Sequence, residues 1–510
     1  MLALPEPALA VSDEFEDVAA ETALLTEDGA VALGMTKLPS ASASAPVSLR
    51  WDFGAGTVIV QARQATELTI AGEQHALEPG THTLTVARPD DAPWTGRLAG
   101  WLEQARAERE RELAAAAEPA ALEAPEMAAS AEGAIGGKPV ASEVIAREDG
   151  DLIALAEGQT VHLLAADGTE VRALQADGPV RVLRWWPEEE LLLVGCTDEQ
   201  VIAFDLAGER RWVFVSEMDP AVWESGKTYW FKSAYPGVHG LHTGVVSGEE
   251  SLAFVGSACT LEAVNADGQL VKRLPIFWGN CWKFQIVDRA DGGRNLLIAQ
   301  WANGTDNISI VNGDTLTETG KGYYGVPAGH TMVGGWTQQN RTGIEYADVN
   351  GDGEPEVVSA TNGIWNRLTI FSGSGTPLFN AQFGPGESAQ PYTTMRDMAV
   401  ADLDGDGDLE IVVAISEGLI VTLDHECRKV WATRLPSAPT HLAVVTPAEG
   451  TPAIVAGCED GTVVRLSGSG EITAQADAGG RVETLQTVRS PEGLLVAATT
   501  EGAVSIYPID

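Results

Sequence analysis

The chain has 510 residues, of which 73 are acidic and 32 are basic, giving a formal net charge of −41. Such a surface repels phosphate backbones and anionic lipid head groups, which excludes nucleic acid and membrane surfaces as natural partners and favours hard cations. The length predicts two or more domains, and no apolar run approaches the ~18 residues of a membrane-spanning helix.

The first predicted domain is a small antiparallel β-domain, a β-sandwich, over residues 1–90. Apolar and polar residues alternate over residues 57–62 and 81–87, which is the period of half-buried strands. Residues 68–86 resemble the closing hairpin of the β-sandwiches that are appended to many carbohydrate-active enzymes. No secretory signal is recognised at the start of the sequence.

Residues 91–138 are predicted to form a helix followed by a linker. Over residues 95–117 a partly apolar stripe favours the helix; its members are Leu98, Trp101, Leu102, Ala105 and Leu113. An Ala/Glu/Pro-rich stretch then continues to about Lys138 and is typical of a linker.

Residues 139–510 repeat one pattern of short apolar strands and Gly-containing turns in eight copies, roughly 40 residues apart where no loop is inserted. Four short strands per copy are typical of a β-propeller blade. The fold class is therefore all-β, with eight blades favoured over seven. The last copy ends after its third strand, and a segment near 136–140 is expected to supply the fourth strand and close the ring.

Two copies carry an acidic loop between their first and second strands. The oxygen-bearing residues are Asp348, Asn350, Asp352, Glu354 and Glu356 in one loop, and Asp402, Asp404, Asp406, Asp408 and Glu410 in the other. Oxygens at loop positions 1, 3, 5 and 9, with Gly at position 6 for a tight turn, can surround one cation, and we expect two calcium sites. Position 12 holds Ser359 or Val413 rather than Glu, which excludes an EF-hand.

These strand–DxDxDG–strand segments resemble the FG-GAP (or VCBS) repeats of integrin α-chains and of many bacterial secreted proteins. Calcium that stiffens the fold favours a calcium-rich compartment, so an extracellular, periplasmic or cell-surface location is expected. Residues 288–293 occupy the equivalent place in another copy without alternating carboxylates, and no metal is expected there. The five cysteines have no metal-binding spacing and are expected to be buried.

The first strand of each blade lines the central channel of a propeller, and the loops that enter it build one face. This placement predicts a ligand-binding set, with Glu483 nearby: His239, His242, Trp282, Lys283, His330, Trp336, Arg341, Arg396, Asp397 and His441. Aromatic platforms with cations between them suit a sugar chain, and an acidic sugar would use the basic residues. The other interpretation is that these charges pair with one another.

The favoured function is a non-catalytic binding or scaffolding module for polysaccharide, and no catalytic residue is assigned. One alternative is a lyase of acidic polysaccharide with His242 or His330 as the base. The repeat plan is similar to that of eight-bladed rhamnogalacturonan lyases, although this chain has only two DxDxDG loops. A protein-docking propeller, as in integrin α-chains, is the other alternative. Residues 207–212 resemble quinoprotein dehydrogenase turns, but the repeated tryptophan-docking sequence is missing, so no quinone cofactor is expected.

Overall fold

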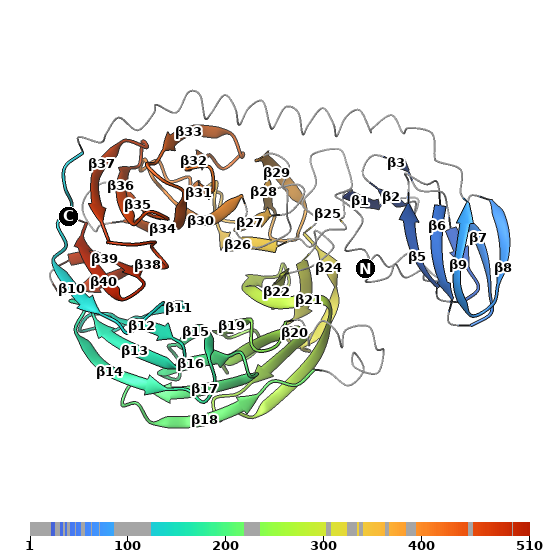
Figure 1. Cartoon of the computed structure of the whole chain (residues 1–510), viewed down its shortest axis with the longest axis horizontal. Helices are drawn as coiled ribbons and strands as arrows, with labels where there is room; N and C mark the ends of the chain where they lie inside the picture. Colours follow the sequence, from blue (N-terminus) through green and yellow to red (C-terminus); the bar gives the residue numbers. More distant parts are fainter. Residues whose placement is uncertain are drawn as a thin grey trace.

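The computed structural model of the chain (Figure 1) describes residues 124–218, 235–301, 308–323, 340–362, 367–383, 394–446, 452–491 and 493–509, residues 334–335, and short segments between 22 and 85. All named elements of these residues are β-strands, so the all-β prediction is confirmed. In the same residues, no helix has the length and apolarity that crossing a membrane requires. The helix predicted over residues 95–117 lies outside the described residues.

The N-terminal strands form three small antiparallel sheets (blue in Figure 1). One is β4-β7-β8, with β4 at Ala41–Ala43, β7 at Thr66–Ile70 and β8 at Glu73–Leu77. Another is β5-β6-β9, with β5 at Val47–Asp52, β6 at Thr57–Ala62 and β9 at Gly80–Thr85. The third joins β1 (Thr22–Leu25), β2 (Val31–Leu33) and β3 (Thr36–Lys37) to β25 (Gly334–Gly335). Alternate residues of β6 and β7 are buried, among them Val58, Val60 and Leu68, which is the alternation that the sequence predicted.

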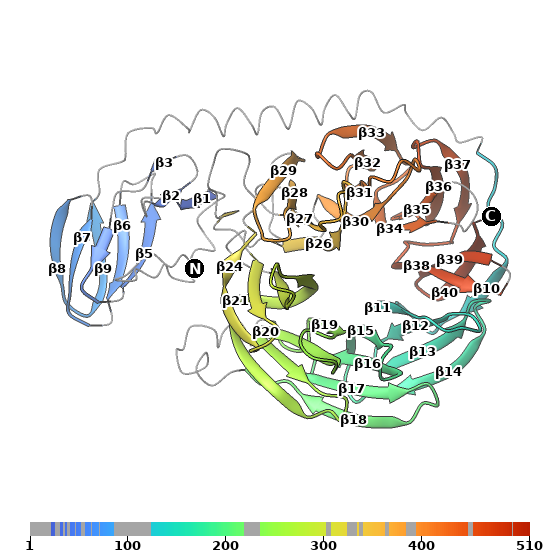
Figure 2. The same ribbon diagram turned by 180° about the vertical axis from the view of Figure 1, so that it is seen from behind.

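From residue 131 onward, antiparallel sheets stand side by side in a ring, as the blades of a β-propeller do (Figures 1 and 2). In the four-stranded sheets between residues 141 and 477, the strand that comes first in the chain lies nearest the centre of the ring (Figure 1). Three of these sheets are β11 (Ala141–Ile145) to β14 (Glu170–Gln175), β15 (Val180–Trp186) to β18 (Arg210–Val215), and β26 (Asn340–Ala347) to β29 (Pro377–Gln382). Their middle strands are β12 (Leu152–Glu157), β13 (Thr160–Ala165), β16 (Leu191–Cys196), β17 (Gln200–Asp205), β27 (Glu356–Asn362) and β28 (Arg367–Phe371).

Two more four-stranded sheets follow along the chain. They run from β30 (Met395–Ala401) to β33 (Lys429–Arg434) and from β34 (Pro439–Val445) to β37 (Ile472–Asp477). Their middle strands are β31 (Glu410–Ile415), β32 (Leu419–Leu423), β35 (Ala453–Cys458) and β36 (Thr462–Ser467).

One sheet of the ring has six strands, because two of its strands are long. Its order is β19 (Gly240–Gly244), β20 (Leu252–Val264), β21 (Leu270–Asp288), β22 (Arg294–Trp301), β23 (Ile308–Asn312) and β24 (Thr317–Gly322). The first part of β20, to Gly256, pairs with β19, and the part from Ala258 pairs with β21. Likewise β21 pairs with β20 up to Asn280 and with β22 from Asn280 onward. Cys259 has a φ of 52° where β20 changes partner.

The ring closes through a strand that precedes the first complete sheet in the chain. β10 (Ala131–Ala134) pairs antiparallel with β40 (Ala503–Pro508), which continues to β39 (Gly493–Thr500) and β38 (Thr484–Ser490). The closing strand therefore lies five residues earlier than the expected segment near 136–140. The expected segment instead contains a bend at Gly136 and Gly137, which lie against the Glu157 carboxylate.

The core lies between neighbouring sheets of the ring. All six residues of β16 are buried, and so are all seven of β27, because sheets cover both of their faces. The five cysteines are buried, as the sequence predicted. Met127 and Ile135 flank β10 and are also buried, at 7% and 9% exposed. Met127 and Ile135 thus pack into the core of the ring.

Replacing Ile135 with Ala should lower the free energy of unfolding by about 2 kcal/mol, since it removes buried methyl groups beside the closing strand. Val140→Ala is the matched control, because Val140 is 50% exposed and its loss should change stability by less than about 0.5 kcal/mol. Urea unfolding of both full-length variants checks this. Equal stabilities would contradict the packing of residues 124–135 on the ring.

Candidate functional site

A β-bulge recurs at the same place in five of the innermost strands. The register shifts between Val180 and Val182 in β15, Cys281 and Lys283 in β21, Arg341 and Gly343 in β26, Met395 and Asp397 in β30, and Pro439 and His441 in β34. The extra residues are Arg181, Trp282, Thr342, Arg396 and Thr440. A bulge leaves the extra residue unpaired and redirects its side chain. The repeated bulges therefore present polar and aromatic side chains at one level of the channel.

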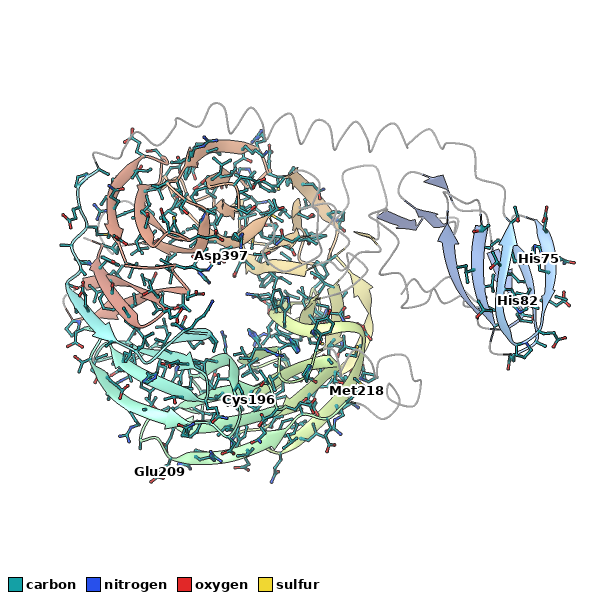
Figure 3. The ribbon with its side chains drawn as sticks, viewed as in Figure 1. His75, His82, Cys196, Glu209, Met218 and Asp397 are labelled. Atoms are coloured by element: carbon teal, nitrogen blue, oxygen red, sulfur yellow. The ribbon has the colours of Figure 1, made fainter. Side chains whose placement is uncertain are left out.

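A cavity of about 850 Å³ lies beside these bulges. It is lined from β15, β19, β21, β26 and β30 and from residues 235–236, that is, from five consecutive innermost strands and the end of a long insertion. Five predicted ligand-binding residues line it, namely His239, His242, Trp282, Lys283 and Asp397. Figure 3 shows Asp397 at the central opening of the ring, whereas Cys196 lies within a sheet and Glu209 at the outer edge.

Sequence reasoning missed six polar residues of this cavity: Arg181, Arg184, Tyr235, Gln285, Thr342 and Glu345. All but Tyr235 lie on innermost strands: Arg181 and Thr342 are the extra residues of bulges, and Arg184, Gln285 and Glu345 each follow such a residue by three positions. The sequence does not reveal these bulges. Of the other predicted residues, His330 and Trp336 lie outside the described residues, as does the side chain of Arg341.

Arg396 and His441 lie among charges that pair with one another. Arg396 is 3.4 Å from Glu459, which is also 2.8 Å from Arg481. Glu483 is 2.9 Å from Lys138. Burial lowers the pKa of His441, and the Asp397 carboxylate opposes this shift. On this side of the channel, the interpretation that charges pair with each other is the one that the contacts support.

Two cavity histidines are held in the neutral form. Burial, and then the charge of Arg181, lower the pKa of His239 to about 4, and Arg181 Nη1 lies 2.8 Å from His239 Nε2. Burial and the charge of Arg184 lower the pKa of His242 to about 3. The His242 ring stacks on Phe284, with ring centroids 6.2 Å apart.

The two acidic residues of the cavity, Glu345 and Asp397, differ in their surroundings. Loss of hydration raises the pKa of Glu345, and Asp397 adds to this shift while Lys283 opposes it. Asp397 accepts hydrogen bonds from the backbone N–H groups of Met398 and Leu442, each at 2.9 Å. The cavity therefore combines cations, neutral imidazoles and aromatic rings with the carboxyl groups of Glu345 and Asp397.

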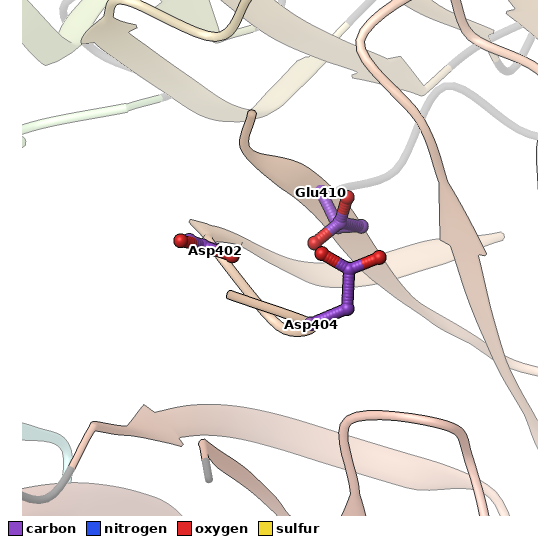
Figure 4. Close-up of side chains that lie close together, drawn as sticks. All are labelled: Asp402, Asp404 and Glu410. Carbon is purple, nitrogen blue, oxygen red and sulfur yellow. The ribbon is translucent and has the colours of Figure 1, made fainter. Parts of the chain in front are cut away.

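The second candidate site is the acidic loop between β30 and β31 (Figure 4). Asp402, Asp404 and Glu410 each offer a carboxylate oxygen, and these oxygens lie within 4.8 Å of one another. Asp402 accepts hydrogen bonds from the backbone N–H groups of Gly405 and Gly407, and Glu410 accepts one from Leu403. Burial and the neighbouring aspartates raise the pKa of Glu410, which indicates an uncompensated negative charge.

The other two acidic residues of this loop are arranged differently. Asp406 accepts a hydrogen bond from the Asp408 backbone N–H, and the Asp408 carboxylate is 3.0 Å from His425 Nδ1. Neither residue belongs to the cluster of three carboxylates. The acidic cluster can hold a metal ion through Asp402, Asp404 and Glu410, and the Asp408 side chain contacts His425.

The loop between β26 and β27 has the same hydrogen-bond plan. Asp348 accepts from Asp352 and Gly353, and Glu356 accepts from Val349. Asn350 also accepts from Asp352, and Asp352 accepts from Glu354. Burial, and then Asp352, Asp348 and Glu354, raise the pKa of Glu356. Both loops thus fold as tight acidic turns at the same point of adjacent sheets.

In the loop at residues 288–293, the Arg289 side chain forms an ion pair with a carboxylate of the same loop. Arg289 lies 2.9 Å from Asp291 and 2.7 Å from Asp314. The Arg289 guanidinium group therefore provides positive charge to Asp291 of this turn and to Asp314 of the turn that follows β23.

Comparisons with known proteins agree with this architecture. Residues 348–413 match the model of the FG-GAP-like repeat, and residues 392–480 match that of the lambda-carrageenase β-propeller domain. No curated protein matches the chain. Among solved structures, the chain resembles Sqt1 of Saccharomyces cerevisiae, with a TM-score of 0.55 and 11% identity over 76% of this chain and 100% of that one. BamB of Moraxella catarrhalis aligns with a TM-score of 0.48 and 14% identity over 75% of this chain and 98% of that one.

The FG-GAP resemblance that the sequence indicated is confirmed by these matches, which include both acidic loops. The likeness to Sqt1 extends to the fold alone. The match at residues 392–480 adds a carbohydrate-related propeller domain, and it covers the sheets from β30 to β37.

The cavity histidines should make the protein sensitive to acid. Both remain neutral in the folded chain, whereas they protonate near the ordinary value of 6.5 when unfolded. The unfolded chain therefore binds more protons below about pH 6.5, and the free energy of unfolding falls as the pH falls toward 4. We expect a loss of about 2 kcal/mol for each histidine between about pH 7 and pH 5.

Urea unfolding of the wild type and of a His239→Gln, His242→Gln double variant at both pH values measures this effect. His82→Gln is the control, because His82 lies in β9, away from the ring. The double variant should lose less stability on acidification than the wild type. An identical loss in the two proteins would contradict the depressed pKa values.

Proposed function

We propose that this protein is a polysaccharide-binding β-propeller that holds a sugar chain in the cavity at its central channel and does not cleave it. The observation that carries this proposal is the composition of the cavity. Trp282, Tyr235 and Phe284 bring aromatic rings into a space that cationic and amide side chains also line. Flat aromatic faces with hydrogen-bonding groups between them suit sugar rings.

The size of the cavity and the comparisons support the same ligand class. A volume of about 850 Å³ accommodates a few sugar residues and lies within the usual range of about 300–1,000 Å³ for ligand sites. The match at residues 392–480 includes Asp397, which lines the cavity. That match is to a domain named for lambda-carrageenase, which supports a carbohydrate ligand.

The acid–base properties of the cavity favour binding over cleavage. A general base works best when its pKa is near the working pH. His239 and His242 have pKa values of about 4 and 3, so neither is tuned for proton abstraction at neutral pH. The lyase alternative retains one supporting observation, which is that His242 is neutral and electrostatically coupled to Arg184.

We propose eight blades for the ring. Each half of β20 and each half of β21 pairs with a different strand, so the six-stranded sheet has the pairings of two four-stranded blades that share long strands. The five four-stranded sheets that begin with β11, β15, β26, β30 and β34 provide five more blades. The closing sheet of β10 and β38–β40 is the eighth.

We also propose that calcium stiffens two neighbouring blades. Asp402, Asp404 and Glu410 would hold one ion, and Asp348, Asn350, Asp352 and Glu356 would hold the other; Glu354, Asp406 and Asp408 contribute negative charge nearby. The raised pKa values of Glu356 and Glu410 support a fit, because a cation would relieve the repulsion that causes them. A calcium-rich location, extracellular, periplasmic or on the cell surface, follows from this dependence as part of the proposal.

Removing calcium should destabilise the ring. With free calcium at a hundred times the dissociation constant, bound calcium would contribute about 2.7 kcal/mol per site, and a chelator should remove this contribution and lower the melting temperature. An Asp352→Ala, Asp404→Ala double variant should be insensitive to the chelator. Asp167→Ala, in the turn after β13, is the control and should keep the sensitivity. A wild-type melt that chelation leaves unchanged would refute the calcium proposal.

The binding function is tested by incubating the full-length protein with a panel of neutral and acidic polysaccharides in calcium. Retention on at least one polysaccharide without new chain ends is the expected result. New chain ends would make the protein an enzyme, and His242 would be the next residue to replace. No retention on any polysaccharide would refute the proposal and favour a protein partner.

A further inference from the structure

We infer that the ligand of the central cavity carries an anionic group, a carboxylate or a sulfate ester, and that Lys283, Arg181 and Arg184 form the subsite that holds it. This inference rests on the proposed function, because it takes the anion to be a substituent of the bound sugar chain. The anion subsite itself follows from how the cations of the channel are paired.

The cations of the channel divide into two groups. On the side of β30, β34 and β38, Arg396, Arg481 and Lys138 each lie within 4.0 Å of a carboxylate oxygen. On the side of β15 and β21, Arg181 and Lys283 have no carboxylate oxygen within that distance in the described part of the chain. Two cations without ion-pair partners thus line one cavity in a protein with a net charge of −41.

The three cationic side chains of the subsite have hydrogen-bonding capacity to spare. Arg181 Nη1 donates a hydrogen bond to the carbonyl oxygen of Pro236, at 2.7 Å, and lies 2.8 Å from His239 Nε2. These contacts orient the guanidinium group and occupy neither its Nε nor its Nη2. Arg184 approaches Glu143 only to 3.8 Å, and its buried Nε has no hydrogen-bond partner in the described residues. Lys283 Nζ lies over the Trp282 ring, 5.6 Å from its centre.

The two carboxyl groups that line the cavity, those of Asp397 and Glu345, form no ion pair within 4.0 Å of Lys283, Arg181 or Arg184 in the described residues. Asp397 instead accepts hydrogen bonds from two backbone N–H groups, and loss of hydration raises the pKa of Glu345. Glu143 lies behind Arg184, where burial favours its neutral form as well. An anion with several oxygen acceptors would satisfy Lys283 and the two guanidinium groups together, which is the pairing that such donors favour.

The position of Lys283 beside Trp282 joins the two parts of the ligand site. An aromatic face binds a sugar ring, and the adjacent ammonium group can bind an acidic substituent of the same or the next ring. A neutral polysaccharide would leave the cations unsatisfied, so the cavity discriminates against it.

The test compares two acidic polymers with neutral ones. Polygalacturonate supplies carboxylates, dextran sulfate supplies sulfate esters, and galactan and dextran are the neutral probes. Affinities of the full-length protein are measured in calcium at low and at moderate ionic strength. We expect retention of one or both acidic polymers and at least roughly tenfold weaker binding of the neutral ones, because hydrogen bonds to charged groups would be lost.

Lys283→Gln should weaken binding of the acidic polymer roughly tenfold and leave the neutral polymers unaffected. Lys272→Gln is the matched control, because Lys272 lies on the same strand, is exposed at the outer edge of its sheet and changes the net charge equally. Lys283→Arg should retain binding. Thermal melts of the variants establish that each is folded.

The outcomes separate this inference from the proposed function. Equal affinities for acidic and neutral polymers, or an equal effect of Lys283→Gln and Lys272→Gln, would overturn the inference and leave polysaccharide binding standing. If no polymer is retained, inorganic sulfate is titrated while the His239 and His242 resonances are followed. Sulfate-dependent shifts that Lys283→Gln abolishes would support the anion subsite and refute the polysaccharide, and their absence would overturn both.

Discussion

The closure of the ring is the constraint on which the rest of this structure depends. Each sheet buries both of its faces against neighbours, so the first and last sheets are stable only when they also meet. The pairing of β10 with β40 achieves this by joining residue 131 to residue 506. Arg489 of β38 forms a salt bridge with Asp151, at 3.0 Å, which joins this closing sheet to the sheet of β11–β14. Once the ring is closed, the first strands of all sheets face one channel, and residues far apart in the sequence line the same cavity.

A closed ring also explains why the polar groups are where they are. The sheets cannot fill the centre of the ring, so the innermost strands border solvent and can carry charge, whereas the second strands, such as β16 and β27, are buried throughout. On one side of the channel the ion pairs around Glu459 and Glu483 hold neighbouring sheets together. On the other side the bulge of β15 presents Arg181, which has no such ion pair in the described residues, and the bulge of β21 presents the Trp282 ring. One side of the channel therefore contributes to stability, and the other is the side on which we propose that the ligand binds.

The sequence was most informative where a residue pattern reports local geometry. The apolar second strands and the acidic loops were identified because buried strands and tight acidic turns require particular residues at fixed spacings. The closing strand was placed five residues late, since Ala131–Ala134 has no strand-like alternation and its pairing comes from β40. Arg181 and Arg184 were missed because β15 is mainly apolar, and its orientation depends on a bulge. Tyr235 was missed because it ends a long insertion whose course the repeat does not determine.

The acidity of the molecule and the cations of its cavity act at different ranges. At physiological ionic strength charges are screened over about 8 Å, so the net charge of −41 repels an acidic polymer weakly beyond that distance. Within the cavity an acidic group of the proposed ligand would lie close to Lys283 and the two arginines, where screening is smaller and their attraction would dominate. An acidic chain that cannot enter the cavity meets only the outer repulsion, whereas one whose acidic group reaches the bulges gains the local attraction. The overall charge thereby contributes to selectivity, because it penalises acidic partners that do not fit the channel.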